Sequence, residues 1–333
     1  MGVAIRELLV DYKKSVDWDS LQGIAAVDAH NALYQFLTII RQPDGTPLMD
    51  AQGRITSHLS GILFRTLNLV EMGIKPVYIF DGPPPHFKRD TVQKRHAVRV
   101  EAKDRWQEAR ERGDTAEAYK QARSSATIDR FVIDSSRQLL GLLGIPWVQA
   151  PSEGEAQAAF MVREGDATYV VSQDLDALLF GTPVLVRNVT ISGKRRVRGR
   201  SVTIAPERIS LKEVLDGLGI TREQLVQIGI LVGTDFNTGI RGVGPKTALR
   251  TVKNGEFQTM ITKEPMDPGA DEILQFFLDP PVMRDYTLHW SPPDPDGVLQ
   301  MLVAGFNFSP ERVESALEKL RVRSGQKTLD RWF

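Results

Sequence analysis

Three short apolar runs of the sequence, near residues 23–27, 77–80 and 168–172, each end in aspartate. The aspartates are Asp28, Asp81 and Asp174, and Asp176 follows the last of them after one residue. Short continuous apolar runs are typical of buried parallel strands, and the working site of an open α/β sheet lies beyond the carboxyl ends of its strands. Carboxylates crowded at one sheet edge repel one another unless a cation lies among them. The pattern therefore predicts a site for divalent metal.

Other acids occupy positions near predicted helix ends. Glu153 and Glu155 follow Ser152, and Ser152-x-x-Glu155 matches a capping box that needs no metal. The two explanations stay open together, because a helix start can hold both glutamates rigidly while they face an ion. Asp235 lies at the end of an apolar helical stretch, where the helix dipole disfavours an acid, so its position indicates another role.

The amino-acid composition limits the kinds of metal site and of binding partner that the chain can have. The chain has no cysteine, which excludes disulfides and thiolate metal sites and favours hard ions such as Mg²⁺ or Mn²⁺. No apolar stretch reaches the ~18 residues of a membrane span, and no secretory pattern opens the sequence, so we expect an intracellular, cytoplasmic protein. The 42 basic and 42 acidic side chains balance, yet the basic residues cluster near 88–105, 194–200 and 319–323, as on a nucleic-acid-binding face.

The order of the predicted elements favours an α/β fold. Strand and helix alternate through the first 190 residues, including a strand near 184–187, which predicts a mostly parallel sheet covered by helices. Residues 86–123 are highly charged and predict two projecting helices with a break at 113–114, followed by a basic hairpin at 192–200. Further helices are expected at 55–72, 128–143, 211–260 with a Gly-rich interruption at 239–244, 271–278 within loops at 261–300, and 309–320.

Several of these motifs occur together in one known family. The order and spacing of Val77-Tyr-Ile-Phe-Asp-Gly-Pro-Pro84, Ala150-Pro-Ser-Glu-Gly-Glu-Ala156, the 174/176 pair and Gly233-Thr-Asp235 followed by Gly242-Val-Gly-Pro-Lys246 resemble the flap structure-specific endonucleases, especially the archaeal members of this 5′ nuclease superfamily. The resemblance covers nearly the whole chain. It implies a PIN-like nuclease core with a mostly parallel twisted sheet flanked by helices, a helical arch and a helix–loop–helix DNA clamp. The implied regions are an N-terminal nuclease region at 1–99, a gateway and arch at 86–123, an internal nuclease region with the clamp at 117–256, C-terminal loops and a helix at 257–320, and a tail at 325–333.

The resemblance also implies a two-metal active site. Two Mg²⁺ ions per subunit, with Mn²⁺ as an alternative, would be held by Asp28, Asp81, Glu153, Glu155, Asp174, Asp176 and Asp235. Paired ions lower the pKa of a bound water and stabilise the entering and leaving oxygens of phosphodiester hydrolysis. Lys88 and Arg95 match the family's catalytic basic positions, although without the resemblance a solvated basic helix face is the favoured explanation of these two residues.

The remaining implied contacts concern DNA and a protein partner. Tyr34 would stack on a base and Arg41 would contact DNA nearby, although Tyr34 also fits the core face of a helix. Gly242, Gly244 and Lys246 belong to the phosphate clamp, where the family also binds a K⁺ ion through backbone oxygens. The tail residues Gln326, Leu329, Trp332 and Phe333 match the box that binds the sliding clamp, proliferating cell nuclear antigen. A monomer that acts on branched DNA, away from membranes, is expected.

The function implied is a 5′ flap endonuclease with 5′–3′ exonuclease activity, acting in Okazaki fragment processing and long-patch base excision repair. A junction- or bubble-cutting repair nuclease of the same superfamily is the first alternative, disfavoured by the absence of a large insertion at 86–123. A non-catalytic adaptor for DNA or the sliding clamp is the second alternative.

Overall fold

A computed structural model describes residues 3–42, 44–190, 194–197, 200–264, 266 and 269–324 of the chain. The chain divides into two compact units. The first unit comprises Met1–Asp28, Ile79–Gln93 and Gln149–Asp285, and the second comprises Ala29–Tyr78, Lys94–Val148 and Tyr286–Phe333. All the carboxylates proposed from sequence as metal ligands belong to the first unit.

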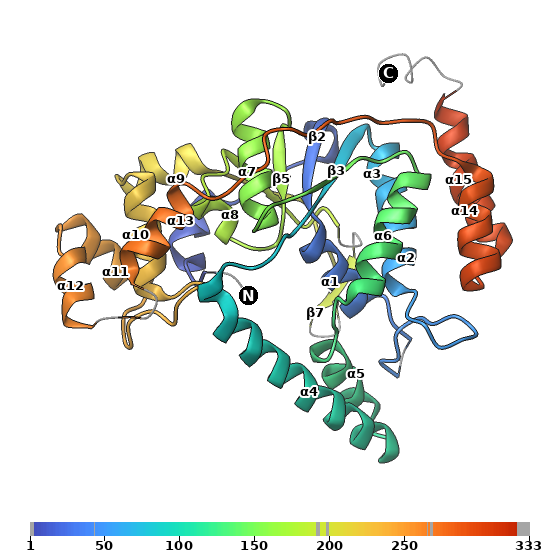
Figure 1. Cartoon of the computed structure of the whole chain (residues 1–333), viewed down its shortest axis with the longest axis horizontal. Helices are drawn as coiled ribbons and strands as arrows, with labels where there is room; N and C mark the ends of the chain where they lie inside the picture. Colours follow the sequence, from blue (N-terminus) through green and yellow to red (C-terminus); the bar gives the residue numbers. More distant parts are fainter. Residues whose placement is uncertain are drawn as a thin grey trace. The chain divides into compact units, whose positions relative to one another are not determined.

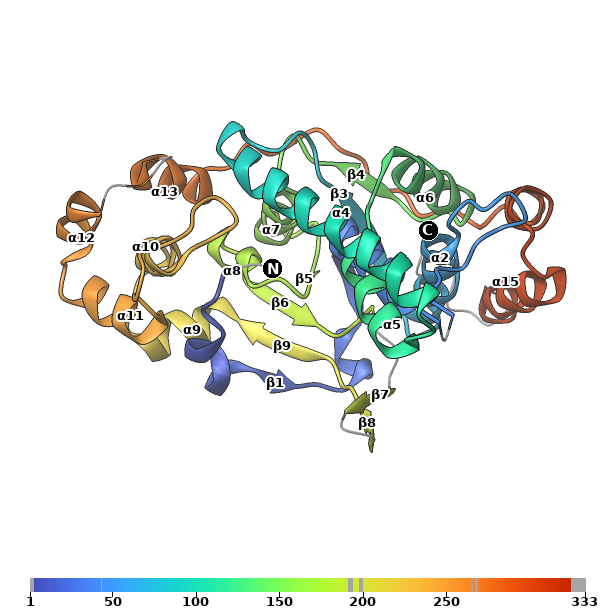
Figure 2. The ribbon, with the colours of Figure 1, turned by 90° about the horizontal axis from the view of Figure 1, so that it is seen from below.

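The sheet that carries the predicted strands is parallel at its centre. Within the described ranges its strand order is β1-β9-β6-β5-β2-β3-β4. The strands are β1 (Lys14–Ser15), β2 (Gly23–Asp28), β3 (Ile74–Phe80), β4 (Trp147–Gln149), β5 (Tyr169–Val171), β6 (Val184–Arg187) and β9 (Glu207–Ser210). β5 pairs in parallel with both β2 and β6. β9 pairs antiparallel with β6 on one side and with β1 on the other, and β6, β9 and β1 lie side by side in Figure 2. The predicted α/β class and mostly parallel sheet are confirmed.

The four strand candidates are confirmed, but the antiparallel edge was not predicted. β1 has only two residues, both exposed, and β9 buries only Ile209 fully. Neither strand contains the apolar run that marks a strand buried on both faces, so the search for such runs missed them.

Helix α7 (Gly154–Glu164) covers the central strands of the first unit. It packs on β2 and β5 and lies beside β5 in Figure 1. Its inward positions include Ala156, Ala158 and Ala159, all fully buried. Because these side chains are small, the helix backbone approaches the sheet closely, which brings the helix start near the carboxyl ends of the strands.

The first unit also contains several helices, as predicted for 211–260 with its Gly-rich interruption. The α-helices are α8 (Asp176–Leu179), α9 (Leu211–Leu218), α10 (Arg222–Val232), α11 (Pro245–Lys253), α12 (Phe257–Lys263) and α13 (Ala270–Leu278). Short helical turns are η1 (Arg6–Tyr12), η2 (Trp18–Leu21) and η4 (His86–Lys88). α10 packs against both α11 and α13, and Thr221 and Gln224 close a capping box at its start.

The second unit contains the charged helices. Its elements are α1 (Ala29–Ile39), α2 (Ser57–Gly61), η3 (Ile62–Thr66), α3 (Leu67–Glu71), α5 (Thr115–Ser124), α6 (Arg130–Leu142), α14 (Pro295–Leu299), η5 (Gln300–Gly305) and α15 (Pro310–Ser324). α4 (Arg89–Glu111) begins in the first unit and continues in the second. The predicted break between the two charged helices is confirmed, since Gly113 has φ of 71° and Asp114 caps α5 by accepting from Glu117 N. No helix in the described residues combines the length and apolarity of a membrane crossing.

Three predicted segments, at 55–72, 261–300 and 192–200, contain more detail in the structure than the sequence predicted. The helix predicted at 55–72 is interrupted by a π-helical stretch, η3. The loops expected through 300 contain α14 and the start of η5, because Pro295 occupies the first turn of α14 and Asp294 caps it by accepting from Gly297 N at 3.0 Å. The basic hairpin exists as β7 (Lys194–Val197) paired with β8 (Arg200–Thr203).

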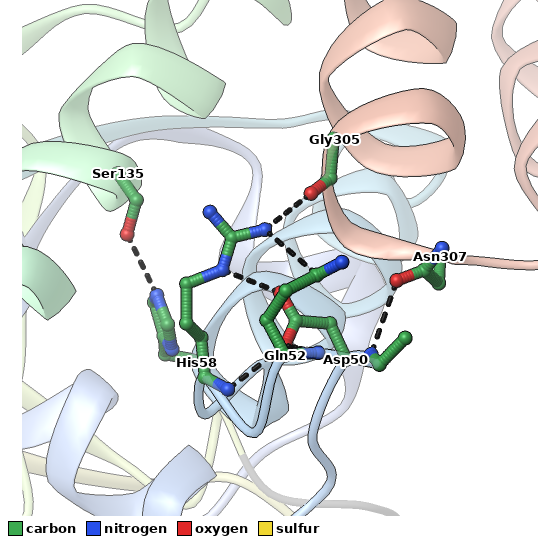
Figure 3. A network of polar contacts seen from close by, with 8 residues as sticks. Asp50, Gln52, His58, Ser135, Gly305 and Asn307 are labelled. Atoms are coloured by element: carbon green, nitrogen blue, oxygen red, sulfur yellow. Dashed lines mark hydrogen bonds and ion pairs between the residues drawn. The ribbon is translucent and has the colours of Figure 1, made fainter.

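A polar network in the second unit connects the turn at 50–54 to the segment after η5 (Figure 3). Asp50 Oδ2 accepts from Arg54 Nε at 2.6 Å, and Arg54 Nη2 donates to the Gly305 carbonyl at 2.5 Å. The Arg54 guanidinium also lies 4.5 Å from the centre of the Phe306 ring. Ala51 N donates to Asn307 Oδ1 at 3.1 Å. These contacts hold the C-terminal segment of this unit on a turn far away in sequence.

A buried histidine joins two helices of the second unit. His58 on α2 is fully buried, and its Nε2 lies 2.8 Å from Ser135 Oγ on α6 (Figure 3). Burial lowers the pKa of His58 to about 3 from its ordinary 6.5. The neutral ring is therefore the form that this unit accommodates.

We predict that His58 makes folding stability depend on pH. Between pH 3 and 6.5 the unfolded chain binds a proton at His58 that the folded chain does not, so stability from this residue is complete above pH 6.5 and falls at lower pH by roughly 1.4 kcal/mol per pH unit. Urea midpoints measured at pH 7.5 and 5 for the wild type and His58→Gln should show a smaller pH dependence in the variant. His289→Gln, at an exposed position, is the control. Equal pH dependence in wild type and His58→Gln contradicts the prediction.

Candidate active site

The parallel register of β2 and β5 brings two predicted acids near the same serine. Val27 lies opposite Val171, so Asp28 and Ser172 end neighbouring strands. Ser172 Oγ lies 3.1 Å from Asp28 Oδ2 and 3.0 Å from Glu155 Oε1. The same hydroxyl accepts a hydrogen bond from Asp174 N at 3.0 Å. A single buried hydroxyl thus ties together three of the predicted ligand residues, and sequence reasoning had not singled it out.

The start of α7 holds two glutamates in a way that differs from a capping box. Glu153 is the N-cap residue, and its own side chain makes no capping hydrogen bond, so the capping-box explanation based on Ser152 and Glu155 is wrong. Instead, Asp81 Oδ1 accepts from Gly154 N at 2.7 Å. The carboxylate of Asp81 therefore occupies the positive end of α7, where the helix dipole favours negative charge.

Asp235 lies on a turn directly after α10. The buried Asn237 side chain holds this turn, because its Nδ2 donates to the Ile230 carbonyl at 2.7 Å and its Oδ1 accepts from Thr234 Oγ1 at 2.8 Å. Thr234 Oγ1 in turn accepts from Phe236 N at 3.0 Å. Asp235 is thus placed by local hydrogen bonds on both sides of it in the chain.

Burial and mutual repulsion perturb the acids at the centre of the group. The pKa of Glu155 is raised well above its ordinary value by burial and then by the charges of Asp174, Asp28 and Asp176. The pKa of Asp176 is likewise raised by burial and by Asp174 and Asp235, although Val3 N donates to its Oδ1 at 2.5 Å. These interactions place the acids from strands, α7 and the Asp235 turn in one electrostatic group.

Lys88 is the cation of this group. Its Nζ lies 2.5 Å from Glu153 Oε2 and 4.0 Å from Asp235 Oδ2. Burial alone lowers the pKa of Lys88, but the charges of Glu153, Asp81 and Asp235 outweigh burial and raise it. The pKa of Glu153 is also raised, by burial and by Asp81, in spite of Lys88. The raised pKa of Lys88 indicates that negative charge exceeds positive charge around its ammonium.

The composition of the group fits hard divalent cations. Seven carboxylates and one lysine leave a buried excess of negative charge, and the donors are oxygens throughout, as Mg²⁺ and Mn²⁺ prefer. In the part of the chain that the structure describes, no three acidic or histidine side chains form a closed ion-binding group. The acids therefore lie in one region but do not converge on a single ion-binding position, as expected for charges that repel one another.

Three other residues predicted to contact DNA or the scissile phosphate, Tyr34, Arg41 and Arg95, belong to the second unit. Tyr34 is 37% exposed on α1 while its neighbours Leu33 and Phe36 are buried, so the core-face explanation of Tyr34 is wrong. Arg41 donates from Nε to the Leu37 carbonyl at 2.7 Å and from Nη1 to the Gly45 carbonyl at 2.8 Å. Arg95 lies in the first half of α4.

The Gly-rich turn before α11 has the predicted form. Gly242 has φ of 84°, Gly244 is the N-cap of α11, and Pro245 occupies its first turn. Lys246 Nζ lies 2.7 Å from Glu7 Oε1, an exposed pair that the sequence did not predict. The tail residues Gln326, Leu329, Trp332 and Phe333 lie outside the described residues.

Comparison with known families defines the class of protein first. Residues 1–102 match the XPG N-terminal domain and residues 144–235 match the XPG I-region. All the predicted ligand residues fall inside these two matches. The chain is therefore of the XPG nuclease class by these two matched regions.

Individual relatives define the family. The chain is 63% identical to flap endonuclease 1 of Methanoculleus marisnigri over the full length of both chains. It resembles the crystal structure of flap endonuclease-1 from Methanococcus jannaschii with a TM-score of 0.76 and 38% identity, covering 94% of this chain and 96% of that one. The chain belongs to the flap endonuclease 1 family.

A more distant structure shares the fold alone. It is the Holliday junction-resolving enzyme GEN1 in complex with product DNA and Mg²⁺, with a TM-score of 0.57 and 18% identity, covering 96% of this chain and 74% of that one.

We predict that Ser172 is required for full activity because it orients three acids. Ser172→Ala removes a hydroxyl within hydrogen-bond distance of Asp28 and Glu155 and should lower DNA cleavage by about tenfold to a hundredfold, the usual cost of losing a group that orients metal ligands. Ser172→Thr keeps the hydroxyl and should retain most activity. Single-turnover cleavage of a 5′-flap duplex is the measurement, and an unimpaired Ser172→Ala protein contradicts the assignment.

Proposed function

We propose that this chain cleaves DNA at the base of 5′ flaps by metal-dependent hydrolysis of a phosphodiester bond. Its membership of the flap endonuclease 1 family supports the substrate. The observation that carries the chemistry is the gathering of seven carboxylates in one region, where burial and then the neighbouring acids raise the pKa of Glu155 and Asp176. Cleavage leaves a 5′-phosphate and a 3′-hydroxyl, as in the family. 5′–3′ exonuclease activity and roles in Okazaki fragment processing and long-patch base excision repair belong to the same proposal.

The carboxylates are proposed to hold two Mg²⁺ ions, with Mn²⁺ as an alternative. One ion would use Asp28, Asp81, Glu153 and Glu155, and the second would share Glu155 with Asp174, Asp176 and Asp235. When bound, such ions supply a nucleophilic water at neutral pH and charge stabilisation for the displacement. In this proposal the protein's own task is to hold seven carboxylates in one region, and the strand ends, α7 and the Asn237-supported turn would serve as their supports.

Lys88 is proposed to contact the scissile phosphate. Its ammonium is half-buried and already next to Glu153, so a phosphate that entered the acidic group would meet a positive charge held in place. A cation positioned in this way stabilises the additional negative charge of the transition state. Arg95 is proposed to share this role, as in the family.

DNA is proposed to be held by residues outside the acidic group. Tyr34 offers an exposed ring on which a base can stack, and Arg41 would contact the same end of the DNA. The turn with Gly242, Gly244 and Lys246 would bind a duplex phosphate through backbone N–H groups and the Lys246 ammonium, because it leads into a helix N-terminus. A K⁺ ion in this turn is part of the same proposal.

A protein partner is proposed for the tail. Gln326, Leu329, Trp332 and Phe333 would bind the sliding clamp, proliferating cell nuclear antigen, in the way that family members do. The enzyme would act as a monomer, in the cytoplasm with the chromosome in a prokaryotic cell or in the nucleus of a eukaryotic one.

We predict that Asp174→Asn separates binding from cleavage. The substitution removes one charge from the proposed second ion site but leaves the DNA contacts, so flap affinity should be kept while Mg²⁺-dependent cleavage falls more than about a hundredfold, beyond the usual loss for an orienting group. Asp216→Asn, in an exposed ion pair with Lys212 on α9, should cleave normally.

The measurement uses a fluorescent 5′-flap substrate, with a bubble and a four-way junction for comparison. Preferred cleavage of the bubble or junction would replace the flap with another substrate. Full activity of Asp174→Asn on all three would refute the assigned metal site.

A further inference from the structure

A cluster of phenylalanine rings lies beside the proposed site in the first unit and contributes no proposed metal ligand. We call it the phenylalanine cluster; its members are Phe87 on η4, Phe180 after α8, Phe236 on the Asp235 turn, and Phe276 and Phe277 on α13. α13 lies beside α10 in Figure 1 and follows both XPG matches in sequence. The cluster therefore links the acidic site to a helix outside the matched regions.

Three of the rings contact one another edge to face. Phe87 and Phe236 have centroids 5.3 Å apart at 87°, Phe87 and Phe276 5.2 Å apart at 84°, and Phe236 and Phe276 5.1 Å apart at 82°. This geometry suits the charge distribution of aromatic rings, so each such pair is stabilising beyond the burial of its apolar surface. Because every ring contacts the other two, none can shift without losing two contacts.

The two rings contributed by the site are sequence neighbours of its charged groups. Phe87 precedes Lys88, and Phe236 follows Asp235. Lys88 Nζ also lies 5.5 Å from the centre of the Phe236 ring. Packing of Phe87 against Phe236 therefore fixes the distance between the backbone that carries the lysine and the backbone that carries the aspartate.

The third ring comes from a helix that is itself anchored. Arg222 Nη2 donates to the Phe277 carbonyl at 2.6 Å, and Phe277 is fully buried against Phe180 and Phe236. A second link joins the helix to η4, since His86 Nε2 lies 3.3 Å from Glu272 Oε1. α13 thus presents Phe276 as a fixed support under η4.

η4 needs such a support. It is a 3-10 turn of three residues with no side-chain cap that leads directly into α4 at Arg89, and a lysine side chain is long and flexible. A positioned cation stabilises a transition state only if its position is fixed before the reaction. The aromatic contacts supply this restraint for η4.

We propose that Phe276 is a positioning residue for Lys88: through Phe87 and Phe236 it holds the lysine ammonium beside Glu153 and Asp235. The proposal rests on the catalytic role given to Lys88 above. Helix α13 contributes none of the proposed metal ligands. In this proposal it nevertheless influences the cleavage step, through Phe87 and Phe236, and has no influence on flap binding.

The test is a double-mutant cycle with Phe276→Ala and Lys88→Ala. Single-turnover cleavage of a 5′-flap duplex is measured in Mg²⁺ at saturating enzyme, and flap affinity is measured separately in Ca²⁺. Phe276→Ala alone should lower the cleavage rate by about tenfold with affinity unchanged. In the Lys88→Ala background it should lower the rate by less than about twofold, because groups that act as a unit are not additive.

Controls separate this role from general destabilisation. Phe257→Ala, a buried ring on α12 outside the cluster, should leave the single-turnover rate unchanged. Phe276→Leu keeps most of the apolar volume, so it remains informative if the alanine variant does not fold; it should lower the rate about twofold to threefold and show the same dependence on Lys88.

Four results would overturn the proposal. One is an equal rate loss with and without Lys88, and a second is loss of flap affinity in place of cleavage rate. The other two concern the single variants. If Lys88→Ala cleaves normally, the proposed function of Lys88 fails, and the positioning role of Phe276 fails with it. If Lys88→Ala is impaired but Phe276→Leu and Phe276→Ala cleave normally, only the positioning role fails.

Discussion

Repulsion among buried carboxylates is the constraint on which the rest of this structure depends. Glu155 and Asp176 lie where burial and neighbouring acids raise their pKa well above the ordinary range, and Lys88 offsets only part of the charge. Such a group is unfavourable for a folded chain by itself, since buried charges need partners. Its presence is explained if divalent cations bind there, and binding to the folded state alone would also stabilise that state.

The fold meets this constraint by placing the acids on rigid supports. Asp28 ends a central strand that lies between β5 and β3, and Asp81 accepts a hydrogen bond from the first N–H of α7, that of Gly154. Ser172 connects acids from a strand, a helix and a turn. Lys88 is the exception, because it lies on one short turn, and the phenylalanine cluster is where the structure restrains that turn. Hydrogen bonds place the acids, while ring packing places the cation.

Much of the acidic site could be predicted because strand-end aspartates carry two local signals at once, an apolar run and a charge directly after it. Ser172 could not be predicted, since a serine after a strand is common. Its importance comes from its contact with Glu155 at the start of α7, and this contact forms only when α7 packs on the sheet. Phe276 was hidden for a similar reason: its partners are 40 to 190 residues away along the sequence. The antiparallel edge strands and α14 were missed because they are short, with little apolar pattern.

Direct observation of the ions tests the central claim that these seven carboxylates form a two-metal centre. Crystals of the wild-type protein grown with Mn²⁺ allow the ions to be located by their anomalous scattering. The account predicts two peaks in the first unit, one coordinated by oxygens of Asp28, Asp81, Glu153 and Glu155 and the other by oxygens of Glu155, Asp174, Asp176 and Asp235. Peaks elsewhere on the protein, with none among these acids at saturating Mn²⁺, would contradict it.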